Sequence, residues 1–230
     1  MRPLLSVIIP ARNEAQALPL LLQDLSALRM AGAEIILVDG ASEDATREVG
    51  AASVDQLLSS KPGRALQMNT GAAAAHGEYL WFVHADTRID AQSIQRLLDT
   101  LLEQPLWGRF DVRLSGQGMM LRLISAMINL RSRVTAIATG DQGIFVARKI
   151  FESQGGYASI ALMEDVELCS RLKLLARPWC LRPALQTSSR RWEQNGVLRT
   201  VVLMWRLRLA YYLGASPESL AREYRRGPPL

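Results

Sequence analysis

The sequence predicts an α/β protein with a doubly wound, mixed but mostly parallel sheet, flanked by helices and followed by C-terminal helices. Short, continuously apolar segments alternate with longer segments in which leucine or alanine recurs at helical spacing. Strands that alternate with helices in this way are typical of parallel sheets. The apolar segments contain few polar residues, as is expected of strands that are covered on both faces.

The first half of the chain follows this alternation closely. Strands are expected at residues 5–9, 34–38, 54–58 and 79–83, and helices at residues 15–30, from about residue 44, at 65–75 and at 89–102. The second half is less regular, with strands expected at 109–114 and 143–147 and helices at 117–138, 164–175 and 197–213. Ser216-Pro217-Glu218 predicts the first turn of a last short helix. No repeat or linker interrupts the sequence, so we expect one domain over residues 1–230.

The composition is that of a globular protein. The chain has 230 residues, of which 49% are hydrophobic and 21% are charged, which suits a single sizeable core. The net charge of +5 comes from 27 basic and 22 acidic residues and is carried mostly by arginine. It favours a phosphorylated ligand or an anionic membrane surface. A nucleic-acid partner is not expected, because no basic run is interleaved with aromatic residues.

A cytoplasmic location is expected. Cys169 and Cys180 form neither a disulfide framework nor a zinc site, and they predict buried thiols in a reducing compartment. The apolar run at residues 4–9 is too short for a signal peptide. No apolar stretch is long enough to span a bilayer.

Polar residues gather where the predicted strands end. They are Arg12-Asn13-Glu14, Asp39, the segment 61–64 and the segment 84–86. In sheets of this kind, ligands bind beyond the carboxyl ends of the strands. These residues therefore define the expected site.

Asp39 ends a buried strand and precedes Gly40. Its carboxylate can accept hydrogen bonds from a base or a ribose hydroxyl, or it can cap the next helix as an ordinary loop residue. Ser42 and Asp44 have the same two interpretations, because both residue types cap helices without any ligand.

Gly63 and Arg64 precede an alanine-rich helix. Free backbone N–H groups at a helix start, together with a guanidinium, suit an anion. The alternative is a solvated basic loop.

Four segments, in order, resemble the family 2 glycosyltransferases of the GT-A fold. They are Val7-Ile8-Ile9-Pro10-Ala11-Arg12-Asn13-Glu14, Val38-Asp39-Gly40-Ala41-Ser42-Glu43-Asp44, His84-Ala85-Asp86-Thr87 and Met163-Glu164-Asp165. The resemblance covers roughly residues 4–175. The blocks 63–72 and 140–145 resemble a bacterial subgroup of arsenosugar-biosynthesis or selenodomain-associated transferases, some of which are described as carotenoid-acid glycosyltransferases, so the substrate stays open.

The resemblance implies transfer of a sugar, of the hexosyl type, from a nucleotide-sugar donor to an acceptor hydroxyl, with inversion. It divides the chain into a nucleotide-sugar-binding half at residues 1–115, an acceptor and catalytic half at 116–192, and C-terminal helices at 193–230. The donor-binding residues that it implies are Pro10, Ala11, Asn13, Glu14, Asp39, Ser42, Gly63, Arg64, Asn69, Ala85 and Asp86.

His84-Ala85-Asp86 takes the place of the family's Asp-x-Asp motif. The resemblance implies that Asp86 binds a divalent cation, Mg²⁺ or Mn²⁺, which suits an oxygen-rich site. His84 replaces the first Asp of the motif, and we expect it to support the site or pack in the core rather than bind the metal.

Asp165 resembles the family's catalytic base, which removes the proton of the acceptor hydroxyl, and Glu164 is the first alternative. The other interpretation is structural, because acidic residues are common at helix N-termini.

Ser188-Ser189-Arg190-Arg191-Trp192 resembles the Gln-x-x-Arg-Trp motif of processive relatives, with Ser188 at the Gln position. The departure favours a non-processive enzyme. We expect Arg190 or Arg191 at the departing diphosphate and Trp192 at the acceptor, with surface packing as the alternative.

Two other functions stay open at the level of sequence. A nucleotidyltransferase uses a similar sheet and metal, but the loop at residues 10–14 lacks its glycine-rich pattern. A non-catalytic protein that binds sugar nucleotides or membrane surfaces is favoured by His84 and opposed by Glu164-Asp165.

The acceptor is expected to be a small molecule or a lipid. The helices at 117–138 and 197–213 carry scattered arginines on a largely apolar background, and such helices can lie in a membrane interface. One hypothesis is therefore peripheral contact with the inner face of the membrane, near Trp205, Tyr211 and Tyr212. The alternative is that both helices simply pack on the sheet.

Overall fold

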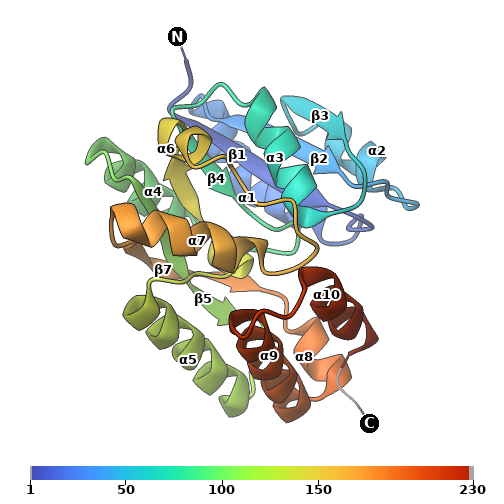
Figure 1. Ribbon diagram of the computed structural model, residues 1–230. Coiled ribbons are helices and arrows are strands. Elements are labelled where there is room, and N and C mark those ends of the chain that lie inside the picture. The colour runs from blue at the N-terminus through green and yellow to red at the C-terminus, as the bar shows by residue number, and fades with distance from the viewer. Residues whose placement is uncertain (1, 228–230) are drawn as a thin grey trace.

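The computed structural model describes residues 2–227, and nothing is described of the side chain of Arg191. A seven-stranded sheet forms the middle of the molecule, in the order β3-β2-β1-β4-β6-β5-β7 (Figure 1). The strands are β1 (Leu5–Ala11), β2 (Glu34–Asp39), β3 (Gln56–Ser59), β4 (Tyr79–Phe82), β5 (Trp107–Leu114), β6 (Phe145–Ala147) and β7 (Trp179–Thr187). Only β6 runs antiparallel to its neighbours. The predicted mixed, mostly parallel sheet is confirmed.

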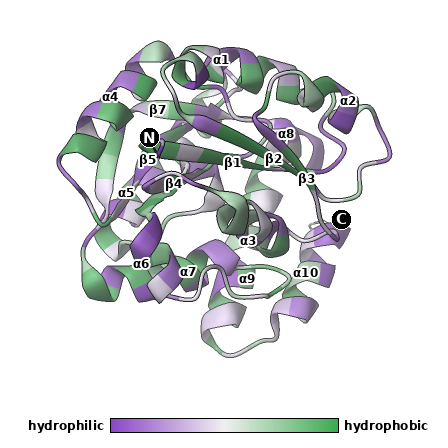
Figure 2. Ribbon diagram, turned by 90° about the horizontal axis from the view of Figure 1, so that it is seen from above, coloured by the Kyte–Doolittle hydropathy of each residue, from purple (hydrophilic) through white to green (hydrophobic). Residues whose placement is uncertain are grey.

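Helices cover both faces of the sheet, as the view from above shows (Figure 2). They are α1 (Leu18–Met30), α2 (Thr46–Ala51), α3 (Arg64–Ala74), α4 (Ala91–Leu102), α5 (Met119–Thr135), α6 (Arg148–Ser153), α7 (Glu164–Leu175), α8 (Arg190–Asn195), α9 (Val197–Tyr212) and α10 (Pro217–Arg226). A 3-10 helix spans Gly140–Gln142.

The strand alternation divides the interior into two cores. Val7 and Ile9 of β1 face the core under α1 and α4, whereas Ile8 faces the core under α3, α7 and α9. Because every strand residue from Leu5 to Ala11 is buried, polar groups of β1 become accessible only beyond its carboxyl end. The ends of β1, β2 and β4 therefore define one rim of the sheet.

The structure differs from the predicted elements mainly in the second half. The strand β7 and the short helices α6 and α8 were not predicted from the sequence. In β7, Pro183 and exposed arginine interrupt the apolar pattern that marks the other strands. The helix expected at 117–138 ends at Thr135, because Ala136 adopts a left-handed conformation with φ of 57°. Within residues 2–227, no helix is long and apolar enough to cross a bilayer.

Candidate active site

The loops after β1 and β2 are joined into one rim by hydrogen bonds. The backbone N–H of Asn13 donates to Ser42 Oγ at 2.9 Å, and Asn13 Oδ1 accepts from the N–H of Glu43 at 2.8 Å. The N–H of Glu14 donates to Thr46 Oγ1 at 2.8 Å. Asn13 has a φ of 57°, a conformation that asparagine tolerates better than most residues. The two loops thus hold one another in place without a ligand.

Asp39 is 2% exposed at the end of β2. Its two carboxylate oxygens accept from the N–H of Ser42, each at 3.3 Å, and Oδ2 lies 3.6 Å from Arg47 Nη1. These contacts brace the loop that follows. These contacts support the interpretation of Asp39 as a structural loop carboxylate. A ligand that bound this carboxylate would share it with Ser42 and Arg47.

A buried glutamine ties the first two strands together at this rim. Gln67 Nε2 donates to the carbonyl oxygens of Ala11 and Val38 at 2.8 and 2.9 Å. The side chain packs against Gly40, where a Cβ atom would lie 2.8 Å from it. Pro10 and Ala11 are buried within β1 and are paired with Val38 and Asp39, so only the residues after them are open to a ligand.

The predicted binding residues of α3 divide into two groups. Asn69 is occupied by the backbone of Tyr157: its Nδ2 donates to the carbonyl at 2.8 Å and its Oδ1 accepts from the N–H at 2.9 Å. It braces the loop before α7. Gly63 and Arg64 are exposed, and Arg64 Nη1 lies 3.5 Å from Glu164 Oε1. The N-termini of α3 and α7 therefore face one another.

The segment after β4 brings acidic groups together. Ala85 is buried and Asp86 half-buried. Burial, followed by the charge of Asp141, raises the pKa of Asp86. Burial, followed by the charge of Asp86, raises the pKa of Glu14. Glu14 Oε2 also lies 3.8 Å from Arg190 Nη2. A cation at this place would relieve the repulsion between these carboxylates.

His84 lies beside the turn that contains Gly140 and Asp141. Its Nδ1 lies 3.0 Å from Asp141 Oδ1. Its Nε2 is buried without a hydrogen-bond partner among the described residues, and a Cβ atom on Gly140 would lie 2.5 Å from it. The supporting role expected of His84 stays a prediction.

The donor set fits a divalent cation that is only partly held by protein. No group of three or more potential metal ligands (His, Cys, Asp or Glu) exists within the described part of the chain. Mg²⁺, however, is usually bound through one or two carboxylates, with phosphate oxygens and waters completing the shell. Asp86 can supply such a carboxylate, with Glu14 beside it.

The two acidic residues at the start of α7 have different surroundings. Glu164 is 3% exposed, and its burial, followed by the charge of Asp165, raises its pKa. Asp165 is more accessible. Its Oδ2 accepts from the N–H of Gly140 at 2.8 Å, and its Oδ1 accepts from the N–H of Val166 at 2.7 Å. Asp165 is thus the better placed of the two to meet a ligand.

The 3-10 helix Gly140–Gln142 connects the two acidic groups. Gly140 contacts Asp165 through its N–H, while the next residue, Asp141, contacts His84. The sequence did not identify Asp141 as a site residue, although the block 140–145 carries part of the family resemblance. The signal is present in the sequence, but the short turn has no helical or strand periodicity.

Trp192 does not reach the rim in its described contacts. It packs with Leu121 and Ile124 of α5 in a small apolar cluster, which supports the packing interpretation. The side chain of Arg191 lies outside the part of the chain that the structure describes. Its neighbour Arg190 is the arginine that approaches Glu14.

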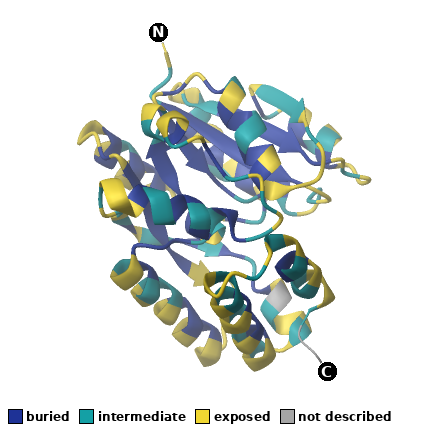
Figure 3. Ribbon diagram, viewed as in Figure 1, coloured by how far each residue is buried: buried dark blue, intermediate teal, exposed yellow. Residues whose placement is uncertain are grey.

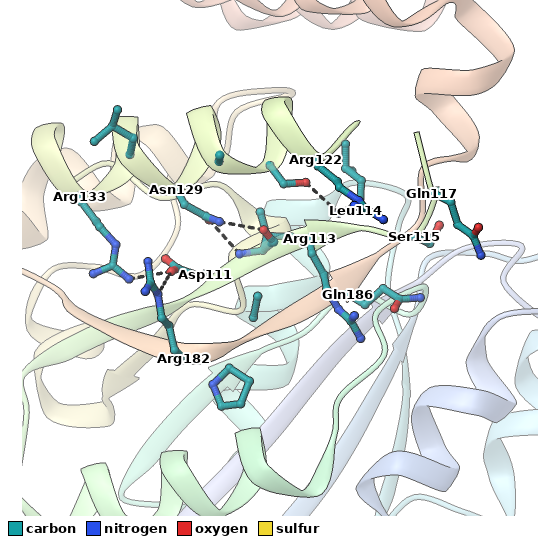
Figure 4. Close-up of a pocket in the computed structure, with 17 residues that line it drawn as sticks. Asp111, Arg113, Leu114, Ser115, Gln117, Arg122, Asn129, Arg133, Arg182 and Gln186 are labelled. Atoms are coloured by element: carbon teal, nitrogen blue, oxygen red, sulfur yellow. Dashed lines mark hydrogen bonds and ion pairs between the residues drawn. The ribbon is translucent and has the colours of Figure 1, made fainter. Parts of the chain in front are cut away.

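A cavity of about 770 Å³ lies away from this rim, between α5, β5 and β7 (Figure 4). Arg133 and Arg182 converge there on Asp111, each at 2.7 Å, and buried Arg109 pairs with the same carboxylate. None of the predicted site residues lines this cavity. Asp111 pairs with two arginines of the lining, and Arg113 and Arg122 line the cavity as well.

Solved structures of low sequence identity share this fold. S. aureus TarS 1-349 superposes with a TM-score of 0.65 at 18% identity, over 89% of this chain and 65% of that one. Its complex with UDP gives a TM-score of 0.67 at 18% identity, over 82% and 60%. This chain thus spans less than two thirds of the TarS fragment. Glucosyl-3-phosphoglycerate synthase from Mycobacterium tuberculosis, in complex with Mn²⁺, UDP and glucosyl-3-phosphoglycerate, gives a TM-score of 0.60 at 20% identity, over 88% and 78%.

No curated protein matches the chain in sequence. A sequence model of a protein family does: the model of glycosyl transferase family 2 matches residues 6–133, which is more than half of the chain. The match contains the rim loops, the segment His84-Ala85-Asp86 and most of α5. The chain belongs to glycosyl transferase family 2.

Proposed function

We propose that the protein transfers one hexosyl group from a nucleotide-sugar donor to an acceptor hydroxyl, with inversion. The observation that carries the proposal is the linkage of Asp86, His84, Asp141, Gly140 and Asp165 beside the rim formed by β1 and β2. It gives a nucleotide-binding edge, a place for a cation and a carboxylate base next to one another. The UDP complexes of TarS and of the mycobacterial synthase support a uridine nucleotide as the first donor to test.

In this mechanism Asp165 takes the proton of the acceptor hydroxyl. The acceptor oxygen forms a bond to the anomeric carbon while the bond from that carbon to the diphosphate oxygen breaks, and the nucleoside diphosphate leaves. A divalent cation at Asp86 would offset the charge that grows on the diphosphate. The backbone N–H of Gly140 and that of Val166 hold the Asp165 carboxylate in one orientation, which favours proton transfer by positioning.

The buried carboxylate of Glu164 serves the same site indirectly. Arg64 lies 3.5 Å from it and is half-exposed, so the guanidinium can face both Glu164 and an anionic ligand. Asp39, Asn13, Glu14 and Ser42 shape the nucleoside side of the site in this proposal.

The experiment that tests the function is a donor panel. Purified protein is incubated with UDP-, GDP- and dTDP-sugars, with and without Mn²⁺, and the phosphorus-containing products are identified. Cation-dependent release of nucleoside diphosphate is expected. Release of sugar 1-phosphate would instead show transfer of the nucleotidyl group, and binding without any release would show a sugar-nucleotide-binding protein.

Within the family we place the chain in the bacterial arsenosugar-biosynthesis and selenodomain-associated subgroup. The blocks 63–72 and 140–145 on which this rests contain Arg64, Gln67 and Asp141, all at the rim. A subgroup defined by site-forming blocks would differ from other members in the sugar or acceptor that it selects.

We also propose that the protein works in the cytoplasm, on the inner face of the membrane. Exposed positions run along α5 and α9 (Figure 3), and many of them hold apolar residues. The apolar stripe on each helix consists of side chains that are 43 to 85% exposed. On α5 these are Met119, Met120, Leu123, Met127, Leu130 and Val134. On α9 they are Leu198, Val202, Trp205, Leu209 and Tyr212. The opposite faces of both helices, with Leu121 and Leu203, are buried. Packing on the sheet therefore accounts for only one face of each helix.

The two stripes lie on neighbouring helices. Leu121 and Ile124 of α5 share an apolar cluster with Val197 and Val201 of α9. Exposed arginines, Arg122 and Arg199, lie on the same helices. Exposed apolar side chains flanked by arginine suit the interface of an anionic membrane.

Co-sedimentation with vesicles tests this attachment. Binding is expected for phosphatidylcholine vesicles that contain phosphatidylglycerol, and it should weaken in high salt. Leu130→Glu and Trp205→Glu should reduce it, whereas Leu174→Glu, an equally exposed apolar site on α7, should not. If wild type stays in the supernatant but forms dimers that both stripe variants dissociate, a second copy covers this face and the membrane proposal is wrong.

A further inference from the structure

Arg131 on α5 is an arginine whose donors are mostly unused. Its Nη1 donates to the carbonyl oxygen of Ile137 at 3.2 Å. Its Nε and Nη2 are buried and have no hydrogen-bond partner in the described part of the chain. A buried guanidinium without a carboxylate is costly, and native structures normally pair such groups.

The difference from Arg109 is the ion pair. Arg109 also has a buried Nε without a partner in the described part of the chain, but it forms an ion pair with Asp111. Arg131 forms no ion pair with any described carboxylate within 4.0 Å. Two donors of Arg131 are therefore left for a partner that is not part of this chain.

The position of Arg131 ties it to the proposed base. In the segment after α5, the carbonyl oxygen of Ile137 accepts a hydrogen bond from Arg131, and that of Ala138 accepts one from Cys169 Sγ. In the same segment, the backbone N–H of Gly140 donates a hydrogen bond to Asp165. Residues 137–140 therefore contact both the guanidinium of Arg131 and the proposed base.

The charges around Arg131 support the same location. Burial, followed by the charge of Arg208 on α9, lowers the pKa of Arg131 to about 10, while Asp165 acts in the opposite direction. Arg208 also acts on Asp141. At a pKa of about 10, Arg131 therefore stays protonated at neutral pH.

We propose that Arg131 binds an anionic group of the acceptor, a phosphate or a carboxylate, and thereby holds the acceptor hydroxyl at Asp165. The inference rests on the proposed function, because it places the acceptor at Asp165. A planar guanidinium with two unpartnered donors suits an oxyanion. An oxyanion would also offset the cost of burying this positive charge.

The anionic group could belong to a small molecule or to a lipid. Arg131 lies on α5, one of the two helices that carry the exposed apolar stripes. The shared chemistry is the oxyanion, and the experiment must separate its two sources.

The first arm uses inorganic phosphate and protein labelled with ¹⁵N-arginine. The Nε–H resonance of Arg131 is assigned from Arg131→Gln, and thermal melting checks that the variant is folded. A saturable shift of this resonance is expected in wild type. Arg131→Gln should weaken phosphate binding about tenfold or more. Arg113→Gln, which removes an exposed arginine that lines the cavity between α5, β5 and β7, should leave it unchanged.

The second arm compares phosphatidylcholine vesicles with and without phosphatidic acid. If the anion belongs to a lipid, phosphatidic acid should strengthen vesicle binding in wild type and Arg113→Gln but not in Arg131→Gln. If it belongs to a small molecule, phosphate binding should depend on Arg131 while vesicle binding does not.

Two results would overturn the inference. One is phosphate binding that is unaffected by Arg131→Gln, and the other is competitive displacement of phosphate by UDP, which would place the anion in the donor site. If the proposed function is wrong, no sugar nucleotide is turned over. Phosphate binding to Arg131 is measured without any donor, so its result does not depend on that turnover.

Discussion

The two sides of the candidate site are built in opposite ways. On the side of β1 and β2, the polar groups of Asn13, Ser42 and Gln67 are occupied by hydrogen bonds within the chain. On the side of α5 and α9, Arg131 keeps two buried donors unused, and apolar side chains face outward. The first side can hold its shape without a ligand, whereas the second is completed only by something that binds to it.

A second contrast separates two groups of arginines. Arg109, Arg133 and Arg182 surround one carboxylate, Asp111, while Arg131 and Arg208 have no such counter-charge at ion-pair distance among the described residues. The same residue type therefore stabilises the fold in one region and is left available in the other. The following predictions test whether this difference is one of function.

The largest effect is expected from Asp165→Asn. The amide keeps the shape of the carboxylate and can still accept from Gly140, but it cannot take a proton at neutral pH. Transfer should fall by about 10²–10⁴-fold, while UDP-sugar affinity, measured by calorimetry, stays within about twofold. Glu167→Gln, which removes a carboxylate that pairs with Arg171 on the same helix, is the matched control. Near wild-type transfer by Asp165→Asn would make Glu164 the first candidate for the base.

Asp111→Asn should affect stability and not donor binding. Burial would raise the pKa of Asp111, but hydrogen bonds from Arg182, Arg133 and Arg109 outweigh it, so the pKa is lowered. The carboxylate therefore stabilises the fold above its unfolded-state pKa, and this stabilisation is lost as the pH falls through the folded-state pKa. We expect the variant to lose about 3 kcal/mol of unfolding free energy at pH 7, by urea denaturation. An unchanged stability would mean that the arginine cluster is not structural.

Gln67→Ala should weaken the donor side moderately. Ala11 still accepts from the N–H of Gly40 after the substitution, so we expect a loss of about 1–2 kcal/mol in unfolding free energy, with UDP binding weakened severalfold. Gln56→Ala is the control, because Gln56 donates to Glu34 and Ala74 near the opposite ends of the strands. It should destabilise to a similar degree and leave UDP binding intact. Equal effects of Gln67→Ala and Gln56→Ala on UDP binding would show that the rim has no special role in binding the donor.

The sequence predicted the first of these two sides much better than the second. The strands ending at Ala11 and Asp39 are continuously apolar, and parallel strands bring their ends to one edge, so residues 12–14, 39 and 84–86 could be placed together from the amino-acid pattern alone. Asp39 and Asn69 could be found as polar residues in this region, but their contacts could not, because periodicity does not show which backbone groups a side chain will reach.

The second side depends on contacts that no local pattern encodes. The turn Gly140–Gln142 is too short for a periodic signal, and β7 is interrupted by Pro183. Arg131 resembles any arginine on an amphipathic helix, and only the packing of the 137–141 segment against it reveals two buried, unused donors. For α5 and α9 the sequence left membrane contact and packing on the sheet both open, because an apolar helix residue has the same letter in a core and on a surface.

The smallest expected effect is that of Arg131→Gln on the stability of the ligand-free protein, and it is also the sharpest test of the comparison. The pKa of Arg131 is lowered to about 10, first by burial and then by Arg208. A basic group whose pKa is lower in the folded state destabilises the fold at every pH below that value, and the penalty fades only as the pH rises through it. At pH 7 the substitution removes this penalty together with the hydrogen bond to Ile137. We therefore expect the unfolding free energy to stay the same or to rise by up to about 1 kcal/mol.

Arg133→Gln provides the matched control on the same helix, since Arg133 is paired with Asp111 at 2.7 Å, and it should lower the unfolding free energy. Inorganic phosphate should then raise the melting temperature of wild type and Arg133→Gln but not of Arg131→Gln, because a ligand stabilises only the folded form that binds it. If Arg131→Gln were the more destabilised of the two variants, Arg131 would be a structural arginine like those around Asp111, and the difference between the two groups of arginines would disappear.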